Sequence, residues 1–418
     1  MNSTQNSPER LYEESLKNPE VQRQIKEISY GVEELITEEE LAIKIANSIT
    51  GRKPLRVKLG VDPTAPDIHL GHTVTLRKLR RFQDLGHEVI FIIGDFTAQI
   101  GDPTGRSQVR PPLSEEEVTK NARTYTEQVF KILEENKTKV VFNSRWLSNL
   151  TLKEIIKLTS LYTVARLLER DDFGNRYRKG IPIYVHEFLY PLMQAYDSVV
   201  VKADVEIGGS DQLFNLLLGR EIQKHYGLQP QIAITMPLLE GLDGVRKMSK
   251  SYGNYVALND SPEDMFGKIM SIPDSLMEKY FRLLTDLPIT QIEKTIKDLK
   301  EGKLHPMEAK AFLAHTIVRM YHGKEKADRA REEFFRVFSK KEVPSDIPKH
   351  HIKKGTRLTK ALLDANLVPS SSEAKRLIKQ GGVYLNGERI TDINHTLDEG
   401  EFTVKVGKRK FARFVVSK

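Results

Sequence analysis

A short lysine-rich motif near the middle of the chain is the first candidate for chemistry. It reads Lys247-Met248-Ser249-Lys250-Ser251 and has glycine-containing turns on both sides. Two lysines three residues apart, with a hydroxyl between them, could fold as a mobile cationic flap over a triphosphate. A solvated lysine-rich loop explains five residues equally well, so the motif alone leaves both interpretations open.

A histidine pair upstream favours the first interpretation. The sequence His69-Leu70-Gly71-His72 follows a strand-like segment and opens a predicted helix. The start of a helix attracts anions, because its backbone N–H groups are unpaired and its dipole is positive there. Gly71 removes a side chain where an adenine or a phosphate must approach closely. Chance surface histidines, or a nucleotidylyltransferase of the same fold, would show the same tetrad.

Together the two motifs resemble the paired signatures of class I aminoacyl-tRNA synthetases, which join an amino acid to ATP and then to tRNA. The resemblance implies that both histidines and both lysines are catalytic and stabilise charge on the phosphates. It also implies ATP as a substrate with Mg²⁺, and no protein-bound metal. The implied ATP contacts are Gly60, His69, Gly71, His72, Gly209, Asp211, Met248 and Lys250.

The loop after the second predicted strand contains Gly101-Asp102-Pro103. Its spacing is not that of a GxxxxGK[ST] phosphate loop, and an aspartate before proline is common in ordinary turns. Compared with tyrosyl-tRNA synthetases, however, Asp102 matches the aspartate that pairs with the α-ammonium of the amino acid. The same comparison makes Arg106 and Arg110 mobile catalytic cations that meet the pyrophosphate opposite Lys247 and Lys250.

Three polar side chains share one face of a predicted helix. Tyr190, Gln194 and Asp197 are spaced i, i+4 and i+7 among apolar residues. A purely structural interpretation makes Tyr190 a core aromatic and Asp197 a turn residue. In the tyrosyl family this pattern forms the substrate pocket, with Asp197 accepting the phenolic hydroxyl and the other two on the α-amino group. The residues implied to bind tyrosine are Thr97, Asp102, Tyr190, Gln194, Asp197 and Gln212.

Two further segments bear on this pocket. In Gly208-Gly209-Ser210-Asp211-Gln212, the resemblance places Asp211 on a ribose hydroxyl and Gln212 near the carboxylate or phosphate, although such a sequence is also a simple turn. The better-known branch of the family has Tyr-Cys-Gly where this chain has Lys58-Leu59-Gly60. The second partner of the substrate hydroxyl is therefore not identified by the sequence.

Positive charge is concentrated at the C-terminus. Residues 351–418 contain 14 Lys and Arg against 7 Asp and Glu, which is +7 of the overall +8. Such a small basic segment is expected of a nucleic-acid-binding module, and also of a solubilising tail. Residues 371–388 predict a basic helix, a Gly-Gly turn and a hairpin at Asn386-Gly387. They resemble the small RNA-binding domain of a ribosomal protein and pseudouridine synthases, which implies that Lys375, Arg376 and Lys379 contact tRNA phosphates.

The elements that must position these residues follow an α/β order. Strand-like segments at 55–61 and 89–93 flank a helix with apolar residues every three positions, which is a βαβ unit and predicts a parallel sheet. Further strands are predicted at 139–143, 203–207 and 231–236. We therefore expect a Rossmann-like parallel-sheet catalytic domain, an all-α domain and a small α+β RNA-binding domain. The predicted boundaries are a helical segment at 1–50, the catalytic domain at 51–257 with a helical insertion at about 112–172, the α-helical domain at 258–342, a linker at 343–351 and the RNA-binding domain at 352–418.

Composition excludes several classes of protein. With 39% hydrophobic and 29% charged residues and short apolar segments, the chain is not expected to span a membrane. Cysteine is absent, which excludes disulfides, thiol catalysis and Cys-ligated zinc. The N-terminus lacks a signal-peptide pattern, so we expect a cytoplasmic protein. Family membership implies a homodimer.

Five motifs in the family's order predict a tyrosine–tRNA ligase that acts on tyrosine, ATP and the tRNA for tyrosine. Two alternatives remain open. A tryptophanyl-type enzyme would share the histidine tetrad but lack the face formed by Tyr190, Gln194 and Asp197. A catalytically silent RNA-binding relative would have decayed motifs.

Overall fold

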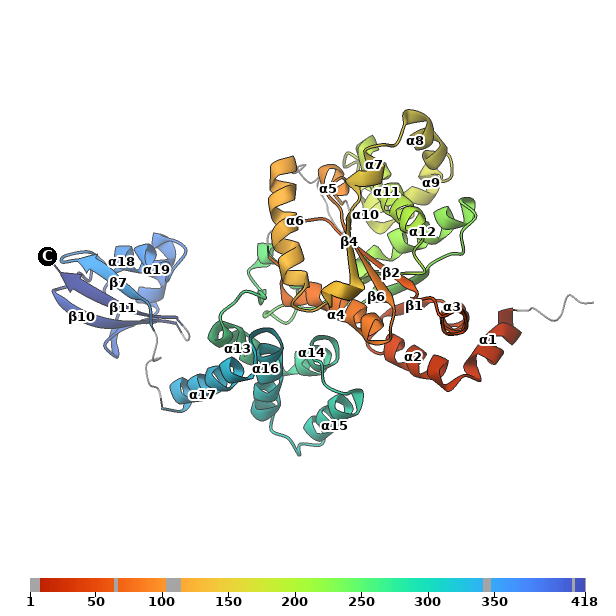
Figure 1. Ribbon diagram of the computed structural model, residues 1–418. Coiled ribbons are helices and arrows are strands. Elements are labelled where there is room, and N and C mark those ends of the chain that lie inside the picture. Colours follow the sequence, from red (N-terminus) through yellow and green to blue (C-terminus); the bar gives the residue numbers. More distant parts are fainter. Residues whose placement is uncertain (1–7, 64–66, 103–113, 341–346, 408–409, 418) are drawn as a thin grey trace, which may run out of the picture. The chain divides into compact units, whose positions relative to one another are not determined.

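The computed structural model describes residues 8–63, 67–102, 114–340, 347–407 and 410–417. These residues form two compact units (Figure 1). The first unit comprises Met1–Asp260 and Ser271–Leu313, and the second comprises Ser261–Met270 and Ala314–Lys418. All the motifs with predicted adenylation chemistry belong to the first unit.

A six-stranded sheet forms the centre of the first unit, in the order β1-β6-β5-β2-β3-β4. Five of its strands run parallel and were expected from the sequence. Strands β3 and β6 are buried along almost their whole length, as expected for a parallel sheet covered on both sides by helices, whereas the central strands β2 and β5 carry Lys58 and Glu206. The strands are β1 (Glu34–Ile36), β2 (Arg56–Val61), β3 (Glu88–Ile93), β4 (Thr138–Phe142), β5 (Val205–Gly209) and β6 (Ile232–Met236).

The sixth strand, β1, is antiparallel and lies in the segment 1–50, which was predicted to be helical. Strand β1 pairs antiparallel with β6, with Leu35 opposite Ile234. A strand of three residues shows no measurable periodicity, and its partner lies some two hundred residues away in the sequence, so nothing local identifies it.

Helices surround this sheet, and α4 and α12 pack directly against its strands (Figure 1). Helix α4 begins at the histidine tetrad and ends near Gly86, where a φ of 90° requires glycine. The helices of the first unit are α1 (Pro8–Leu16), α2 (Pro19–Ser29), α3 (Glu38–Gly51), α4 (Leu70–Asp84), α5 (Thr97–Ile100), α6 (Glu115–Val129), α7 (Ser144–Leu147), α8 (Leu152–Thr159), α9 (Val164–Leu167), α10 (Asp171–Arg178), α11 (Val185–Val201), α12 (Leu213–His225), α14 (Met277–Leu284) and α15 (Ile289–Lys300).

The predicted insertion at about 112–172 is only partly helical. Strand β4 lies inside it and pairs along its whole length with β3, so this segment completes the sheet. Helix α6 precedes the strand and α7 to α10 follow it. The sequence predicted a strand at 139–143, and its pairing with β3 makes this part of the segment a member of the central sheet.

The second unit contains helices and a separate small sheet. Helices α13 (Pro262–Met270) and α17 (Lys324–Lys340) pack together, with the Phe266 and Phe334 ring centroids 5.3 Å apart. Helix α16 (Pro306–His322) includes residues of both units. The small sheet has the order β7-β11-β10-β8-β9. Its strands and helices are β7 (Lys349–Lys353), α18 (Leu358–Asp364), α19 (Ser371–Lys379), β8 (Val383–Leu385), β9 (Glu388–Ile390), β10 (Gly400–Val406) and β11 (Lys410–Ser417).

The C-terminal module has its own hydrophobic core, which includes the fully buried side chains of Leu358, Ile378 and Phe414. The hairpin predicted at Asn386-Gly387 is confirmed, since β8 and β9 pair across these two residues, which have φ of 47° and 86°. One boundary differs from the prediction, because residues 349–351 of the expected linker belong to β7 and pair with β11. The α/β class with a C-terminal α+β module is confirmed.

Candidate active site

Polar side chains converge where four parallel strands end. Asp62 follows β2, Thr97 opens α5 after β3, Asn143 follows β4 and Gln212 follows β5. The carboxyl ends of parallel strands meet at one edge of a sheet, which is where α/β proteins bind ligands. Thr97 Oγ1 donates to Asp62 Oδ1 at 2.7 Å, and Asn143 Nδ2 donates to Thr97 Oγ1 at 3.1 Å. A Cβ at Gly94 would lie 2.1 Å from the Asp62 carboxylate, so this close approach requires glycine.

Helix α11 places its polar face over this edge. Tyr190, Gln194 and Asp197 lie on it as the i, i+4, i+7 spacing indicates, and the helix continues four residues beyond Asp197. The Tyr190 hydroxyl donates to Asp62 Oδ2 at 2.9 Å. The structure thus brings this face of the helix together with the end of β2.

Asp197 is a buried acceptor with two protein donors. Trp146 Nε1 donates to Oδ1 at 2.7 Å and Asn143 Nδ2 donates to Oδ2 at 3.2 Å. Burial raises the pKa of the Asp197 carboxyl to about 6, against the opposing effects of the Lys58 charge and of the two hydrogen bonds. A carboxylate accepts up to about four hydrogen bonds, so Asp197 can accept from a ligand hydroxyl as well.

A chain of amide side chains runs from α11 to the loop after β3. Gln194 Oε1 accepts from Asn215 Nδ2 at 3.0 Å, and the same nitrogen donates to Gln212 Oε1 at 2.8 Å. Gln212 Nε2 then donates to Asp102 Oδ2 at 2.8 Å. Arg170 closes the chain by donating to Asn215 Oδ1 at 3.1 Å, and it lies 3.6 Å from Asp102. Three residues predicted to bind the amino acid, Gln194, Gln212 and Asp102, therefore belong to one network.

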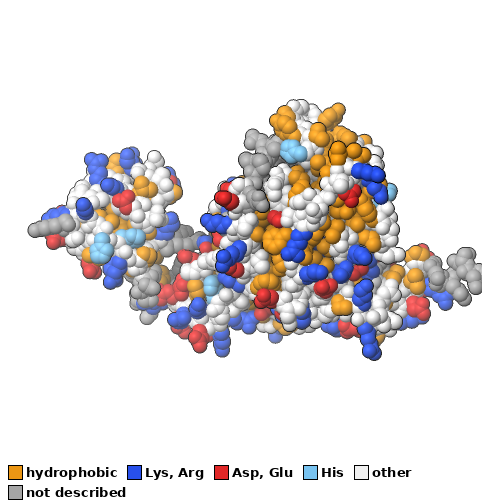
Figure 2. Space-filling model, turned by 45° about the horizontal axis from the view of Figure 1, so that its top comes forward, with side chains coloured by type: hydrophobic (Ala, Val, Ile, Leu, Met, Phe, Trp, Pro, Cys, Tyr) orange, Lys and Arg blue, Asp and Glu red, His pale blue; other side chains and the backbone are white. Residues whose placement is uncertain are grey.

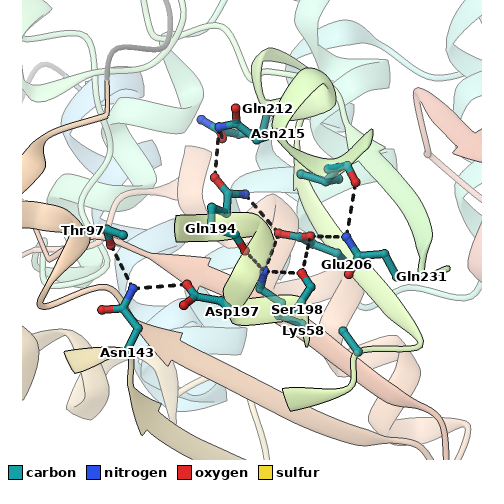
Figure 3. Close-up of polar contacts among 12 residues, drawn as sticks. Lys58, Thr97, Asn143, Gln194, Asp197, Ser198, Glu206, Gln212, Asn215 and Gln231 are labelled. Carbon is teal, nitrogen blue, oxygen red and sulfur yellow. Dashed lines mark hydrogen bonds and ion pairs between the residues drawn. The ribbon is translucent and has the colours of Figure 1, made fainter. Parts of the chain in front are cut away.

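Beneath α11, Lys58 forms a buried ion pair with Glu206 (Figure 3). The two side chains are 0% and 1% exposed, and Lys58 Nζ lies 3.0 Å from Glu206 Oε1. Lys58 Nζ also donates to the backbone oxygen of Gln194 at 2.9 Å and to Ser198 Oγ at 2.7 Å. These three polar contacts of Lys58 are therefore all with the protein, on α11 and β5.

The two histidines of the tetrad stack at the start of α4. Their ring centroids are 3.8 Å apart, and the His69 backbone N–H donates to His72 Nδ1 at 3.3 Å. A Cβ at Gly71 would lie 2.9 Å from the His69 ring, so glycine is required for the stacking. His69 Nδ1 is buried and has no hydrogen-bond partner among the described residues. Such an atom is available to a ligand.

Both histidines are neutral at pH 7. Burial holds the pKa of His69 far below its usual value, with the His72 and Lys250 charges acting in the same direction. Burial, followed by the Lys250 charge, lowers the pKa of His72 to about 4. Because His72 Nδ1 accepts the backbone hydrogen bond, the proton of the neutral ring is on Nε2. His72 can therefore donate one hydrogen bond to an anion.

Each lysine of the cationic motif is paired with a carboxylate. Lys250 Nζ lies 2.8 Å from Asp67 Oδ2, beside the histidine tetrad, and Lys247 Nζ lies 3.5 Å from Asp211 Oδ2, after β5. Both pairs are partly exposed, so each contributes little to stability. The lysines can exchange these partners for a phosphate at small cost.

The stem of the lysine motif is held by Asn254 and Asp243. Asn254 Nδ2 donates to the backbone oxygens of Arg246 and Lys247 at 3.2 Å each, and Asn254 Oδ1 accepts from the Ser249 N–H at 2.9 Å. The Asp243 carboxylate accepts from the Arg246 N–H at 3.0 Å. These bonds shape the backbone from which the two lysines project.

The remaining predicted nucleotide contacts lie near the same edge. Gly60 is the penultimate residue of β2 and has open space where a side chain would begin. A Cβ at Gly209 would lie 2.7 Å from Asp211 Oδ1, so a side chain there would displace the Asp211 carboxylate. Met248 is buried, and its backbone N–H donates to Leu239 O at 2.7 Å.

Some predicted site residues lie elsewhere. Arg106 and Arg110 fall outside the described residues. Lys375, Arg376 and Lys379 lie on α19 in the second unit. The side chains of Lys375 and Lys379 are exposed, whereas Arg376 pairs with Glu373 at 2.6 Å.

The structure also adds polar residues that the sequence did not identify as part of the site: Asp62, Asn143, Trp146, Arg170, Glu206 and Asn215. Two of them had a usable signal, because Asp62 directly follows the strand predicted at 55–61 and Asn143 is the last residue of the strand predicted at 139–143. Trp146 is the only tryptophan in the chain, but its type alone does not indicate a role. The others depend on partners far away in the sequence.

Across the described part of the chain, no helix is long and apolar enough to cross a membrane. Within the same residues there is no cluster of three or more His, Cys, Asp and Glu side chains that could hold a metal ion.

Comparison with known proteins agrees with the geometry. Residues 50–339 match the family described as tRNA synthetases class I (W and Y), and residues 356–402 match the S4 domain. The chain is 56% identical to a tyrosine–tRNA ligase of Carboxydothermus hydrogenoformans over 407 residues, covering 96% of this chain and 99% of that protein. It is 55% identical to the tyrosine–tRNA ligase of Thermotoga maritima, covering 94% and 97% of the two chains.

Solved structures share the fold. A tyrosyl-tRNA synthetase from Archaeoglobus fulgidus, crystallised with L-tyrosine, aligns with a TM-score of 0.60 at 26% identity, covering 74% of this chain and 99% of that one. A truncated mitochondrial tyrosyl-tRNA synthetase from Aspergillus nidulans aligns with a TM-score of 0.63 at 24% identity, over 79% and 99% of the two chains.

Proposed function

The chain belongs to the class I tRNA synthetases that act on tryptophan and tyrosine, and we propose that it is a ligase that joins tyrosine to its tRNA. Full-length relatives that are more than half identical bear the name tyrosine–tRNA ligase, which disfavours the tryptophanyl alternative. The intact histidine and lysine motifs oppose a catalytically silent relative. The observation that favours tyrosine as the amino acid substrate is a buried aspartate, Asp197, at the end of the pocket.

The reaction has two steps. An oxygen of the tyrosine carboxylate attacks the α-phosphorus of ATP, and the bond to the leaving pyrophosphate breaks, which gives tyrosyl-adenylate. A hydroxyl of the terminal adenosine of tRNA then attacks the tyrosyl carbonyl and releases AMP. The first nucleophile is already ionised at pH 7, so the protein's task there is to orient the reactants and to stabilise the phosphate charge.

We assign the tyrosine pocket to α11 and the carboxyl edge of the sheet. Asp197 accepts the phenolic O–H, oriented by Trp146 and Asn143. The α-ammonium group is held by Asp102, Gln194 and the Tyr190 hydroxyl. Gln212 completes the pocket near the tyrosine carboxylate. Thr97 contributes indirectly, through its hydrogen bond to Asp62.

The phosphate side of the site is assigned to the two motifs. His72 donates from Nε2 as a neutral ring, and His69 offers its unpartnered Nδ1 beside it. Lys247 and Lys250 leave their carboxylates to meet the triphosphate, joined by Arg106 and Arg110. Gly60, Gly71, Gly209, Asp211 and Met248 surround the adenosine in this assignment.

Magnesium is expected to arrive with ATP, held by phosphate oxygens and water, which are the ligands this ion prefers. We assign no resident metal to the protein.

The C-terminal module is assigned to tRNA. It matches the S4 domain and carries most of the net charge of the chain. Lys375 and Lys379 project from the polar side of α19 as phosphate contacts, with Arg376 between them. We propose a cytoplasmic location for the protein, in keeping with the absence of cysteine from its sequence.

We also assign a homodimer, with the interface on the helices that follow β4. Leu152 and Ile156 of α8 are 72% and 60% exposed, and Val164, Tyr177 and Val185 are exposed nearby in the sequence. Figure 2 shows hydrophobic side chains gathered in a broad patch on the first unit. Patches of this kind mark protein interfaces, and a second copy of the chain is the proposed partner.

The proposed function is tested by pyrophosphate exchange with each of the twenty amino acids, where only tyrosine should support rapid exchange.

Replacement Asp197→Ala should reduce the preference for tyrosine over phenylalanine by roughly 10² or more. A site that hydrogen-bonds a substrate hydroxyl rejects the analogue without it by roughly 10⁴ to 10⁵, a range for which tyrosyl enzymes are themselves the standard example. Unchanged preference in this variant would contradict the pocket assignment.

The same carboxylate predicts a pH dependence. With a pKa of about 6, Asp197 is ionised above that pH and progressively protonated below it. We therefore expect the KM for tyrosine to rise as the pH falls below about 6, while the KM for ATP changes less. Exchange rates measured between pH 5 and pH 8 would check this, and a flat KM for tyrosine would be the contrary result.

Replacement Lys250→Ala should lower the rate of adenylate formation by roughly 10², with tyrosine affinity nearly unchanged, because the lysine acts on charge that develops in the transition state. Stopped-flow measurement of adenylate formation separates the two quantities. The control is Lys279→Ala, which removes a lysine paired with Glu240 outside the motif. Equal loss of tyrosine binding in Lys250→Ala would mark the loop as structural.

The double replacement Lys375→Glu/Lys379→Glu should leave tyrosine-dependent pyrophosphate exchange intact and weaken tRNA binding. Each lost phosphate contact should also lower the salt dependence by roughly 0.7 to 0.9 in log–log slope. Filter binding of tRNA at several salt concentrations measures both effects, with the exposed Lys26→Glu as the control. A wild-type slope in the double variant would exclude these two lysines as phosphate contacts.

The double replacement Leu152→Glu/Ile156→Glu should convert the dimer to a monomer, because two buried carboxylates would face the partner across an apolar interface. Analytical ultracentrifugation at several concentrations measures the mass directly. The control is Leu11→Glu, another exposed apolar residue, on α1. A variant that stays dimeric would place the interface on another surface.

A further inference from the structure

The buried ion pair between Lys58 and Glu206 lies outside every role assigned above. All three N–H protons of Lys58 are used within the protein, by Gln194 O, by Ser198 Oγ and by Glu206 Oε1. Lys58 has no proton left for a ligand. It therefore does not replace the substrate-hydroxyl donor of the better-known branch and must act through its neighbours.

Glu206 determines how the Gln194 amide is oriented. Its Oε1 accepts from Gln194 Nε2 at 3.0 Å as well as from Lys58. Its Oε2 accepts from Ser198 Oγ at 3.1 Å and from Gln231 Nε2. An ionised carboxylate only accepts hydrogen bonds, so Gln194 must turn its NH₂ group toward Glu206 and its carbonyl oxygen away from it.

This orientation continues through the neighbouring amides (Figure 3). The Gln194 carbonyl oxygen faces Asn215 Nδ2, which also donates to Gln212 Oε1. Gln212 in turn points its NH₂ group at Asp102. Glu206 at one end and Asp102 at the other are both acceptors, so the donors diverge from Asn215 and each of the three amides has one orientation that satisfies the chain. In this arrangement Gln194 turns its carbonyl oxygen, and not its NH₂ group, away from Glu206, which suits a substrate ammonium group.

Lys58 fixes the backbone of the same helix. Its bonds to Gln194 O and Ser198 Oγ join the central strand β2 to the turn of α11 that also contains Asp197. Its positive charge opposes the rise in the pKa of Asp197 that burial causes. One buried cation thus acts on both ends of the proposed tyrosine pocket.

We propose that the Lys58–Glu206 pair is a positioning device for tyrosine, which sets the orientation of the Gln194 amide and holds Gln194 and Asp197 against the sheet. Neither residue contacts the substrate. The inference rests on the proposed function, because Gln194 and Asp197 bind tyrosine only within that assignment.

The test is the double replacement Lys58→Met/Glu206→Gln, which removes both buried charges together. Removing one partner leaves an unpaired buried charge, whereas removing both is often close to neutral for stability. The matched control is Arg176→Met/Glu187→Gln, a second buried ion pair that ties α10 to the start of α11. Pyrophosphate exchange gives KM for tyrosine and for ATP and the preference for tyrosine over phenylalanine, and thermal unfolding measures stability.

We expect the Lys58/Glu206 variant to raise the KM for tyrosine roughly 10- to 100-fold and to lower the preference over phenylalanine at least about tenfold, with the KM for ATP within about twofold. The control variant should keep all three values. Wild-type tyrosine parameters in the Lys58/Glu206 variant would overturn the inference. So would parallel losses for tyrosine and ATP in both variants, since these indicate a structural role only.

A milder change covers the case in which the double variant does not fold. Replacement Ser198→Ala removes only the hydroxyl between Lys58 and Glu206, and it should raise the KM for tyrosine about three- to tenfold while leaving that for ATP unchanged. An unchanged KM for tyrosine would then count against the inference.

If the wild-type chain shows no tyrosine-dependent exchange, the proposed function itself fails. If wild type and variants exchange equally, only the positioning role fails.

Discussion

Glu206 is an ionised carboxylate in the middle of the central sheet, and such a buried charge must have its hydrogen bonds satisfied. The buried polar side chains around it in the first unit are placed so that they donate these bonds. Glu206 receives one cation, two amides and a hydroxyl, from β2, α11 and the start of β6. Leaving such a charge unpaired costs several kcal/mol, so these partners cannot reorient independently. Together with Asp102 at the other end, this buried acceptor sets the orientation of the three amides between them.

The phosphate side of the site obeys a different rule, because its charges must remain exchangeable. Lys247 and Lys250 pair with partly exposed carboxylates, which hold them weakly and leave them free to change partners. The two histidines, by contrast, are kept neutral by burial. Under the proposed assignment, neutral histidines beside exchangeable lysines allow a triphosphate to enter and pyrophosphate to leave. In the same proposal the amino acid side is held rigid for selectivity, and the nucleotide side stays adjustable for turnover.

The local placement of most candidate side chains was predictable from short sequence patterns. The histidine tetrad, the lysine motif and the face of α11 each depend on residues a few positions apart, and short spacing determines which side chains share a helix face or a turn. The parallel strands were predicted for the same reason, since their buried apolar segments need no knowledge of the partner strand. The basic C-terminal module was identifiable from charge alone together with the Asn386-Gly387 turn.

Tertiary structure alone decided what depends on residues distant in the sequence. Strand β1 exists because β6 pairs with it, and the place of β4 in the sheet depends on β3. The role of Lys58 could not be read from its strand, where an apolar residue would be expected, because its partners lie about 140 residues away on α11 and β5. Trp146 and Asn143 reach Asp197 only after β4 joins the sheet. Sequence spacing specifies which side chains face together within one element, whereas the free energy of a buried charge depends on every element packed around it.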